Sequence, residues 1–430
     1  MKKLRFTFFC IFLTIGLLKS QVNTYSPYSY FGVGELENSF HPTSISMGGV
    51  NSTLSEINYV NFKNPSSYSY LELTSFEIGN KTNFSKISNN SIDQNNFTTR
   101  LSHISLGFPL SKKIGFAVSL VPFSSVGYDI TSTMEDSELG TVQHTYSGEG
   151  GFNQFLIGTS WAPVKNISIG LNCNWNFGTI SKNTYVSTGN SPVYFGDEII
   201  YSIGDVNYDI GFLYNYNIND YQLKIGSVFS PEKKISSSIN RSQYTYSYSN
   251  NFINVLDTIS IETNHLNSDL SLPLNYSIGI SLENIDSWIL ALDYSYTNWA
   301  ISDNILWDQT TYSLVDQNEF SFGAQIVPKK DDIYNYFNTV EYRFGLSYSS
   351  GYLDLANISH ENIRSTNLEQ ISFSFGMGLP INNLASMFHL GLKYNTTISS
   401  DDPSMINQNY LSFNLAMTLN EKWFKKIKID

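Results

Sequence analysis

Hydrophobic and polar residues alternate without a break from Ile167 to Gly178. The odd positions carry Ile, Leu, Cys, Trp and Phe, and the even positions carry Ser, Gly and Asn. Successive side chains of a β-strand point to opposite faces, so this segment is predicted to be a strand with one apolar and one polar face. Such a strand suits a soluble sandwich, whose apolar face meets a core, or a membrane barrel, whose apolar face meets lipid.

The same two-residue period recurs from Leu73 to the end of the chain. The predicted strands lie at 76–81, 104–110, 114–120, 155–161, 167–178, 206–218, 223–225, 276–282, 288–296, 320–322, 342–348, 371–379, 388–394 and 411–419. These make about 14 strands, and bacterial membrane barrels have an even number.

The predicted connections alternate in length, as the periplasmic turns and external loops of a barrel do. Short links fall at 111–113, 163–166, 217–220, 284–286 and 380–385, and one short position is stretched, at 328–338. Long links fall between them at 85–95, 132–145, 181–198 and 300–316. A soluble sandwich has no reason to keep this alternation.

Charged residues within the predicted strands sit opposite the large apolar side chains. They are Glu77, Lys81, Asp209, Lys224, Asp293, Arg343 and Lys393. A cation facing lipid at the midplane costs about 2–4 kcal/mol, so a barrel would turn these charges toward its lumen. There they form either a ladder of salt bridges or a site for a ligand head group, with Arg343 or Lys393 pairing with a carboxylate.

The composition also bears on the choice between a soluble sandwich and a membrane barrel. Aromatic residues make up 15% of the chain and charged residues only 14%, where about 25% charged is usual. The net charge of −12 argues against nucleic acid as a partner, because phosphates would be repelled. Trp161, Trp288 and Trp423 are placed at the predicted periplasmic rim, where aromatic girdles lie. We therefore predict an all-β, antiparallel transmembrane β-barrel, with a soluble sandwich or propeller as the alternative.

Residues 1–20 have the pattern of a signal peptide, with Lys2, Lys3 and Arg5 before a short apolar core. Cleavage is expected near Ser20, which also removes Cys10 and leaves Cys173 alone, so no intramolecular disulfide can form. No lipid anchor is expected at Cys10. Export of an acidic, aromatic-rich chain without disulfides predicts the bacterial outer membrane as its location.

Residues 21–72 do not alternate. The pair Gly48 and Gly49 permits a tight turn, and Asn64 followed by Pro65 also favours a turn. The segment could be a periplasmic arm, a disordered leader or a plug inside the barrel. A plug, or hatch, is favoured because fourteen strands enclose a wide lumen. The predicted division is a signal peptide at 1–20, a hatch at 21–72 and a barrel at 73–430.

These features resemble the FadL/TodX family of long-chain fatty acid and hydrocarbon transporters, in the divergent form common in Bacteroidetes. The resemblance rests on the Gly-Gly segment, the Asn-Pro-small motif, the fourteen-strand wall and the C-terminal run NEKWFKKIKID. In that family the N-terminal segment is a hatch that contains Asn-Pro-Ala, which corresponds here to Asn64, Pro65 and Ser66. The family's third strand has an inward kink through which ligand leaves sideways, and here that strand contains Pro122 and Gly127, which disfavour regular pairing.

The resemblance implies passive, non-enzymatic passage of a hydrophobic small molecule across the outer membrane, with lipid and that ligand as partners. Two alternatives stay open: a PorV-type barrel subunit of type IX secretion, with a secretion-system partner, and a structural or adhesive barrel. No cofactor, metal site or catalytic residue is predicted. The six histidines are scattered, and none shows a metal-ligand spacing.

Overall fold

The computed structural model describes residues 24–37, 40–89, 93–249, 252–284, 287–300, 313–355, 368–381, 386–398 and 406–423. The predicted signal peptide and the last seven residues lie outside these ranges. None of the helices in the described ranges is long and apolar enough to span a bilayer.

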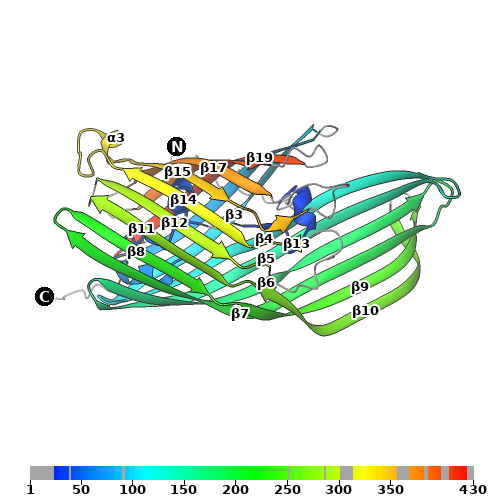
Figure 1. The fold of residues 1–430 in the computed structure, drawn as a ribbon, viewed down its shortest axis with the longest axis horizontal. Helices are drawn as coiled ribbons and strands as arrows, with labels where there is room; N and C mark the ends of the chain where they lie inside the picture. The colour runs from blue at the N-terminus through cyan, green and yellow to red at the C-terminus, as the bar shows by residue number, and fades with distance from the viewer. Residues whose placement is uncertain are drawn as a thin grey trace, which may run out of the picture.

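Nearly all regular structure is β-strand (Figure 1). The N-terminal residues form η1 (Pro27–Tyr30), β1 (Glu35–Leu36), α2 (Pro42–Ser46) and η2 (Pro65–Tyr70). The strands that follow are β2 (Thr74–Ser88), β3 (Asp93–Ser111), β4 (Ile114–Asp136), β5 (Gly140–Val164), β6 (Ile167–Thr188), β7 (Tyr194–Ile218), β8 (Tyr221–Ser230), β9 (Lys233–Ser249), β10 (Phe252–Leu272), β11 (Asn275–Asn284), β12 (Trp288–Thr297), β13 (Ser313–Leu314), β14 (Gln317–Ile326), β15 (Glu341–Ser349), β16 (Leu353–Asp354), β17 (Glu369–Pro380), β18 (Met387–Ile398) and β19 (Asn407–Glu421), with helix α3 (Tyr336–Thr339) before β15.

Fourteen of these strands close into an antiparallel barrel, which confirms the predicted fold. The ring runs β2 to β8, then β11, β12, β14, β15, β17, β18 and β19. It closes where β19 pairs with β2, from Asn407–Ser88 to Glu421–Thr74. Every predicted strand lies within one of these elements.

In the wall, apolar side chains face outward and polar side chains face inward, which is the reverse of their arrangement in a soluble protein. On β6, Ile169 and Trp175 are 46% and 49% exposed, whereas Asn172 and Asn174 are 0% and 1% exposed. The same arrangement runs around the ring, since outward Phe, Leu and Ile side chains are exposed on nearly every strand. A soluble sandwich would bury the apolar register, so the outward solvent is lipid.

Short turns gather at one end of the barrel, at the left of Figure 1. Trp161 and Trp288 flank two of these turns, as expected for the periplasmic rim. At the other end the long loops predicted at 85–95, 132–145 and 181–198 are mostly strand, because β2 to β7 run on well past the apolar belt. The loop predictions were wrong because these strand extensions lie outside lipid. A strand there need not alternate apolar with polar residues, so its sequence resembles that of a loop.

A further hairpin, β9 with β10, was not predicted. β9 pairs with the outer half of β7, from Tyr194–Tyr246 to Ile203–Ser237, and β10 pairs with β9. The apolar part of β7, residues 206–218, is about 40 Å long, which is about 30 Å along the membrane normal at a 45° tilt. The hairpin therefore projects outside the membrane, at the right of Figure 1.

The N-terminal residues 24–37 and 40–72, which we call the hatch, pack inside the ring. The inward glycines of the wall mark the contact, since a Cβ at Gly115 would overlap the backbone of Tyr68 and one at Gly226 would overlap that of Ser52. Met47, Val50 and Phe62 are at most 1% exposed. Small wall residues thus make room for a close-fitting backbone.

Candidate functional site in the barrel lumen

The glycine pair of the hatch makes a tight turn after α2. Gly48 and Gly49 have φ of 73° and 99°, values that L side chains rarely adopt. The turn brings Gly48 against the backbone of Leu346 and Phe322, and Ser374 Oγ accepts a hydrogen bond from Gly48 N at 3.0 Å. This pair therefore docks the hatch against β14, β15 and β17.

The Asn-Pro-Ser motif caps η2. Asn64 Oδ1 accepts from Ser66 N at 3.0 Å, and Asn64 Nδ2 donates to Ser52 O at 2.6 Å. Pro65 lies against the inward face of Gly170, where a Cβ would overlap it. The motif holds two turns of the hatch together and presses them against the wall.

Two wall carboxylates anchor the hatch backbone. Asp293 Oδ2 accepts from Asn51 N and Ser52 N, both at 2.7 Å. Glu77 Oε1 accepts from Val60 N at 2.8 Å. These two side chains accept backbone N–H groups at both ends of one short hatch segment, residues 51–60, and so fix that segment against the wall.

The other predicted lumen charges also point inward, and most have partners within the wall. Lys224 pairs with Glu283 at 2.9 Å. Arg343 pairs with Glu341 and donates from Nε to Gln325 at 2.7 Å. Asp209 accepts from Asn174 at 2.7 Å and from Ser230 at 2.6 Å, Lys81 pairs with Glu37 of the hatch at 3.4 Å, and Lys393 lines a cavity.

The wall has a seam between β3 and β4. Their ladder runs only from Ile104–Leu120 down to Ser111–Ile114, while β4 continues to pair with β5 up to Asp136. A register shift between Pro122 and Ser124 marks the point where β4 leaves β3. This bulge also changes the side-chain alternation, so Val126 faces inward although Val118 and Leu120 belong to the outward register.

The hatch covers this seam. Residues Glu35 and Leu36 of β1 pair with Ser125 and Ser124 of β4, and Glu37 N donates to Phe123 O at 2.9 Å. On the same stretch, Gly127 N donates to Ser29 Oγ at 3.1 Å. A strand of the hatch therefore pairs with β4 beyond the point where β3 leaves it.

An ionic contact joins the two sides of the seam. Arg100 of β3 pairs with Glu37 and donates to Ser125 Oγ at 3.0 Å. Burial by itself would raise the pKa of Glu37, but Arg100 and Lys81 together hold that pKa below its usual value. Glu37 is therefore an anion at neutral pH, held between two cations.

Apolar side chains line the lumen beside the seam. One cluster joins Val33 of the hatch to residues of the wall and of the β9–β10 hairpin. The wall residues are Val126, Tyr128, Phe152, Ile180, Tyr201 and Ile203, and the hairpin residues are Ile235 and Leu272. Tyr28, Tyr30, Phe31 and Leu36 pack against it. We call this set the inner apolar cluster. It lies toward the external end of the barrel, whereas inward polar side chains of the wall surround the rest of the hatch.

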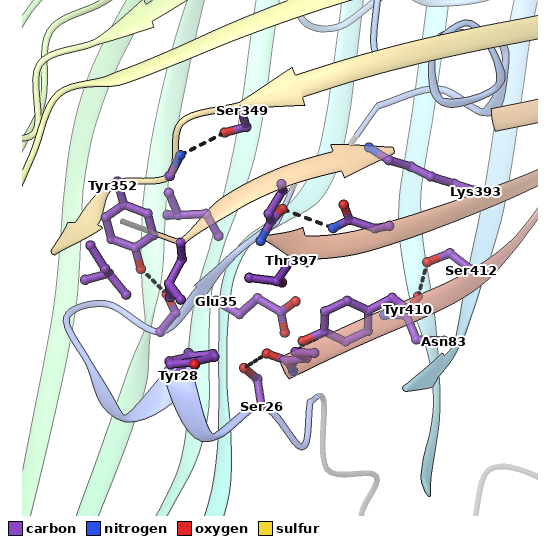
Figure 2. A pocket seen from close by; sticks show the side chains of 18 of the residues that line it. Ser26, Tyr28, Glu35, Asn83, Ser349, Tyr352, Lys393, Thr397, Tyr410 and Ser412 are labelled. Atoms are coloured by element: carbon purple, nitrogen blue, oxygen red, sulfur yellow. Dashed lines mark hydrogen bonds between the residues drawn. The ribbon is translucent and has the colours of Figure 1, made fainter. Parts of the chain in front are cut away.

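Described residues of the hatch line two cavities between hatch and wall. The first, of about 140 Å³, is lined mainly by polar side chains, including Ser26, Glu35, Lys393 and Tyr410, which Figure 2 shows around one space. The second, of about 230 Å³, reaches the seam at Leu36, Glu37 and Phe123 and extends to Trp299. The lumen thus offers polar and apolar surface close together.

The structure also assembles histidines that the sequence left scattered. His41, His103 and His389 are all at most 3% exposed, and the ring of His41 lies 5.8 Å and 4.7 Å from the rings of His103 and His389. Burial, with smaller effects of His389 and His103, lowers the pKa of His41 well below its usual value. Glu77 lies between His41 and His103. No sequence spacing signals this cluster, because its members come from the hatch, β3 and β18.

Among solved structures, the fold is similar to several hydrocarbon channels and transporters. The monoaromatic hydrocarbon channel CymD matches with a TM-score of 0.56 at 12% identity, covering 92% of this chain and 100% of CymD. The toluene transporter TbuX of Ralstonia pickettii matches with a TM-score of 0.57 at 12% identity, covering 89% and 98%. TodX of Pseudomonas putida matches at 0.54 and 13% identity, covering 90% and 98%. At these identities the likeness shows a shared barrel fold.

The sequence comparisons give a more specific assignment. No curated protein matches the chain. A family model described as BamG matches residues 1–430, which is the whole chain. The protein therefore belongs to the BamG family.

Proposed function

We propose that this protein is a passive outer-membrane channel for small hydrophobic or amphipathic molecules, with lateral exit through the β3–β4 seam. The observation that carries the proposal is the seam itself, where a two-residue hatch strand, in place of the wall strand β3, pairs with β4. The inner apolar cluster would accept the apolar body of a long-chain fatty acid or hydrocarbon-like ligand. The polar cavities beside it suit a polar group at one end of such a ligand.

In this mechanism the hatch is the moving part. Release of Glu35 and Leu36 from β4 would open the seam toward lipid without breaking any pairing between wall strands. The inward hatch and the gap in the ladder support this route, and the FadL-type fold is that of known hydrocarbon channels.

A disulfide across the seam tests the proposal. Glu35 and Ser125 are directly paired residues, so Glu35→Cys with Ser125→Cys would lock β1 to β4. In proteoliposomes, with Cys173 replaced by Ser, we expect oxidation to reduce uptake of a labelled fatty acid or of toluene to the level of protein-free vesicles. A reductant should restore it.

The matched control is Ser347→Cys with Ser372→Cys, a directly paired couple on β15 and β17, away from the seam. Its oxidation should leave uptake unchanged. Equal uptake by the oxidised and reduced seam variants would contradict lateral exit, and no uptake by any variant would contradict transport.

A second candidate is a barrel subunit that binds a protein partner, such as a PorV-type component of a secretion system. The observation that favours it is the external β9–β10 hairpin, on which Val255, Leu256, Ile259 and Ile261 are 54–70% exposed. Co-purification under mild detergent tests it. A stoichiometric partner that is lost when Val255 and Ile261 are changed to Ser, with uptake unaffected, would favour this role over transport.

A further inference from the structure

Three ligand-type side chains meet at one buried point between the hatch and the wall. His41 immediately precedes α2 of the hatch, Glu77 lies on β2 and His103 lies on β3. The Nε2 atoms of His41 and His103 lie 3.6 Å and 3.8 Å from Oε2 of Glu77. Each of the three residues is at most 3% exposed, and their ligand atoms all lie within 4.8 Å of one another.

Both imidazole nitrogens that face Glu77 lack a hydrogen-bond partner among the described residues. A buried polar atom without a partner is costly, so native structures usually pair it with protein, water or an ion. At 3.6 and 3.8 Å the contacts with Glu77 are too long for hydrogen bonds. Two nitrogens and one oxygen are thus aimed at a common point without touching.

The surrounding groups orient this set in the way that outer contacts orient metal ligands. His103 Nδ1 lies 2.9 Å from Ser102 Oγ, which can accept its proton and leave Nε2 free to bind. Glu77 Oε2 accepts from Ser105 Oγ at 2.9 Å, which fixes the carboxylate. The third histidine, His389, is engaged elsewhere, with Nε2 at 3.0 Å from Thr418 Oγ1 and Nδ1 at 3.4 Å from Arg343.

We propose that His41, Glu77 and His103 bind a divalent transition-metal ion, with Zn²⁺ as the best fit. Two imidazoles and one carboxylate are a known zinc ligand set. Tetrahedral bonds of about 2.0–2.1 Å place ligand atoms about 3.3 Å apart. The two separations from Glu77, 3.6 and 3.8 Å, are close to that value, and the two imidazole nitrogens lie within 4.8 Å of each other.

One hydrogen bond must yield for the ion to bind. His41 Nδ1 accepts from Thr43 N at 3.2 Å, which places the ring proton of the metal-free protein on Nε2. Binding moves that proton to Nδ1, which ends this neutral hydrogen bond. Arg343, the nearby cation, is already paired with Glu341, so its charge opposes a second cation only in part.

The ion would connect the hatch to the wall. His41 belongs to the hatch, whereas Glu77 and His103 belong to adjacent wall strands. Such a site would bind its ion as the hatch docks, and the ion would stabilise the docked state by mass action. This inference does not depend on the proposed transport.

Metal content tests the proposal directly. The full-length protein, expressed without a polyhistidine tag in zinc-supplemented medium, is purified in detergent, and its zinc is measured by mass spectrometry. We expect about one zinc per chain, and His103→Gln and Glu77→Gln should bind zinc at least about tenfold more weakly. The matched control is His144→Gln, which removes a histidine of β5 stacked on Tyr146, outside this cluster; it should retain the ion.

A second measurement separates ligation from a purely structural role. Co²⁺ loaded in place of zinc should give the visible absorption of a tetrahedral site in the native protein and in the His144 variant, and none in the His103 variant. Circular dichroism confirms that each barrel is folded. Zinc content equal in the native protein and in folded His103→Gln, or no zinc in either, would overturn the proposal.

Discussion

Arg100 of β3 and Glu37 of the hatch form an ion pair across the seam, where β3 and β4 stop pairing with each other although both strands continue. The contact joins a wall strand, the hatch and, through Ser125, the far side of the seam. It is therefore the contact on which hatch closure should depend most.

Replacing Arg100 by Gln should loosen the hatch at β1. Loss of one partner of a buried pair costs about 3–5 kcal/mol, and Lys81 keeps the effect near the lower figure. We expect the amide of Glu37 to exchange about a hundredfold faster with deuterium. Arg241→Gln, which removes the external pair with Asp197, is the control and should leave that amide protected. Unchanged exchange in the Arg100 variant would mean that the pair does not hold the hatch.

Acid should have the same effect as removing Arg100. The pKa of Glu37 is lower in the folded protein than its unfolded value of about 4.3. Its contribution to hatch docking is therefore complete above that pH and is lost as pH falls through the folded pKa. Limited proteolysis of the hatch from pH 7 to pH 3 should show the release. Glu37→Gln should remove the part of the transition that this residue causes, and an identical profile would exclude Glu37 as its origin.

A methyl group on the inner wall should displace the hatch. Gly226→Ala would place a Cβ against the carbonyl of Ser52, and overpacking of this kind costs about 1–3 kcal/mol. Gly204→Ala is the matched control, because a Cβ at Gly204 meets no atom within 4 Å. Thermal unfolding in detergent and protease sensitivity of residues 48–56 measure the difference. If both variants behave alike, the close approach of hatch and wall is wrong.

An outward charge should be costly only at the middle of the wall. Leu171 is 48% exposed on the outward face of β6, and Leu171→Arg should destabilise the barrel in lipid by about 2–4 kcal/mol. Trp161→Arg, near the turn at the periplasmic rim, should cost about 0–1 kcal/mol. Unfolding in urea from lipid vesicles gives both values. Equal costs would place the lipid belt elsewhere.

The barrel could be predicted because lipid on one side and a polar lumen on the other impose a strict alternation. Ile169 and Asn172 show that the predicted faces were assigned correctly. The external hairpin β9–β10 was not predicted because it lies beyond the lipid belt, where no lipid imposes an apolar outer face and so no strict alternation.

The lumen was harder to predict. The inward set of charges follows from the alternation, but their partners do not, since Glu37 and Val60 come from a segment without periodicity. The bulge at Pro122 exchanges the two registers of β4, so the inward position of Val126 could not be read from the lower half of that strand. The meeting of His41 with His103 depends on the path of the hatch, which only the folded chain reveals.

The hatch precedes every wall strand in the chain, yet the ring is completed only by the last strand, β19, on the first, β2. The hatch is thus synthesised before the wall that surrounds it, and the ring cannot close until β19, the last strand to be synthesised, reaches β2. Ring closure therefore joins the two ends of the wall, which lie more than 300 residues apart in the chain, beside a hatch that was synthesised before either of them.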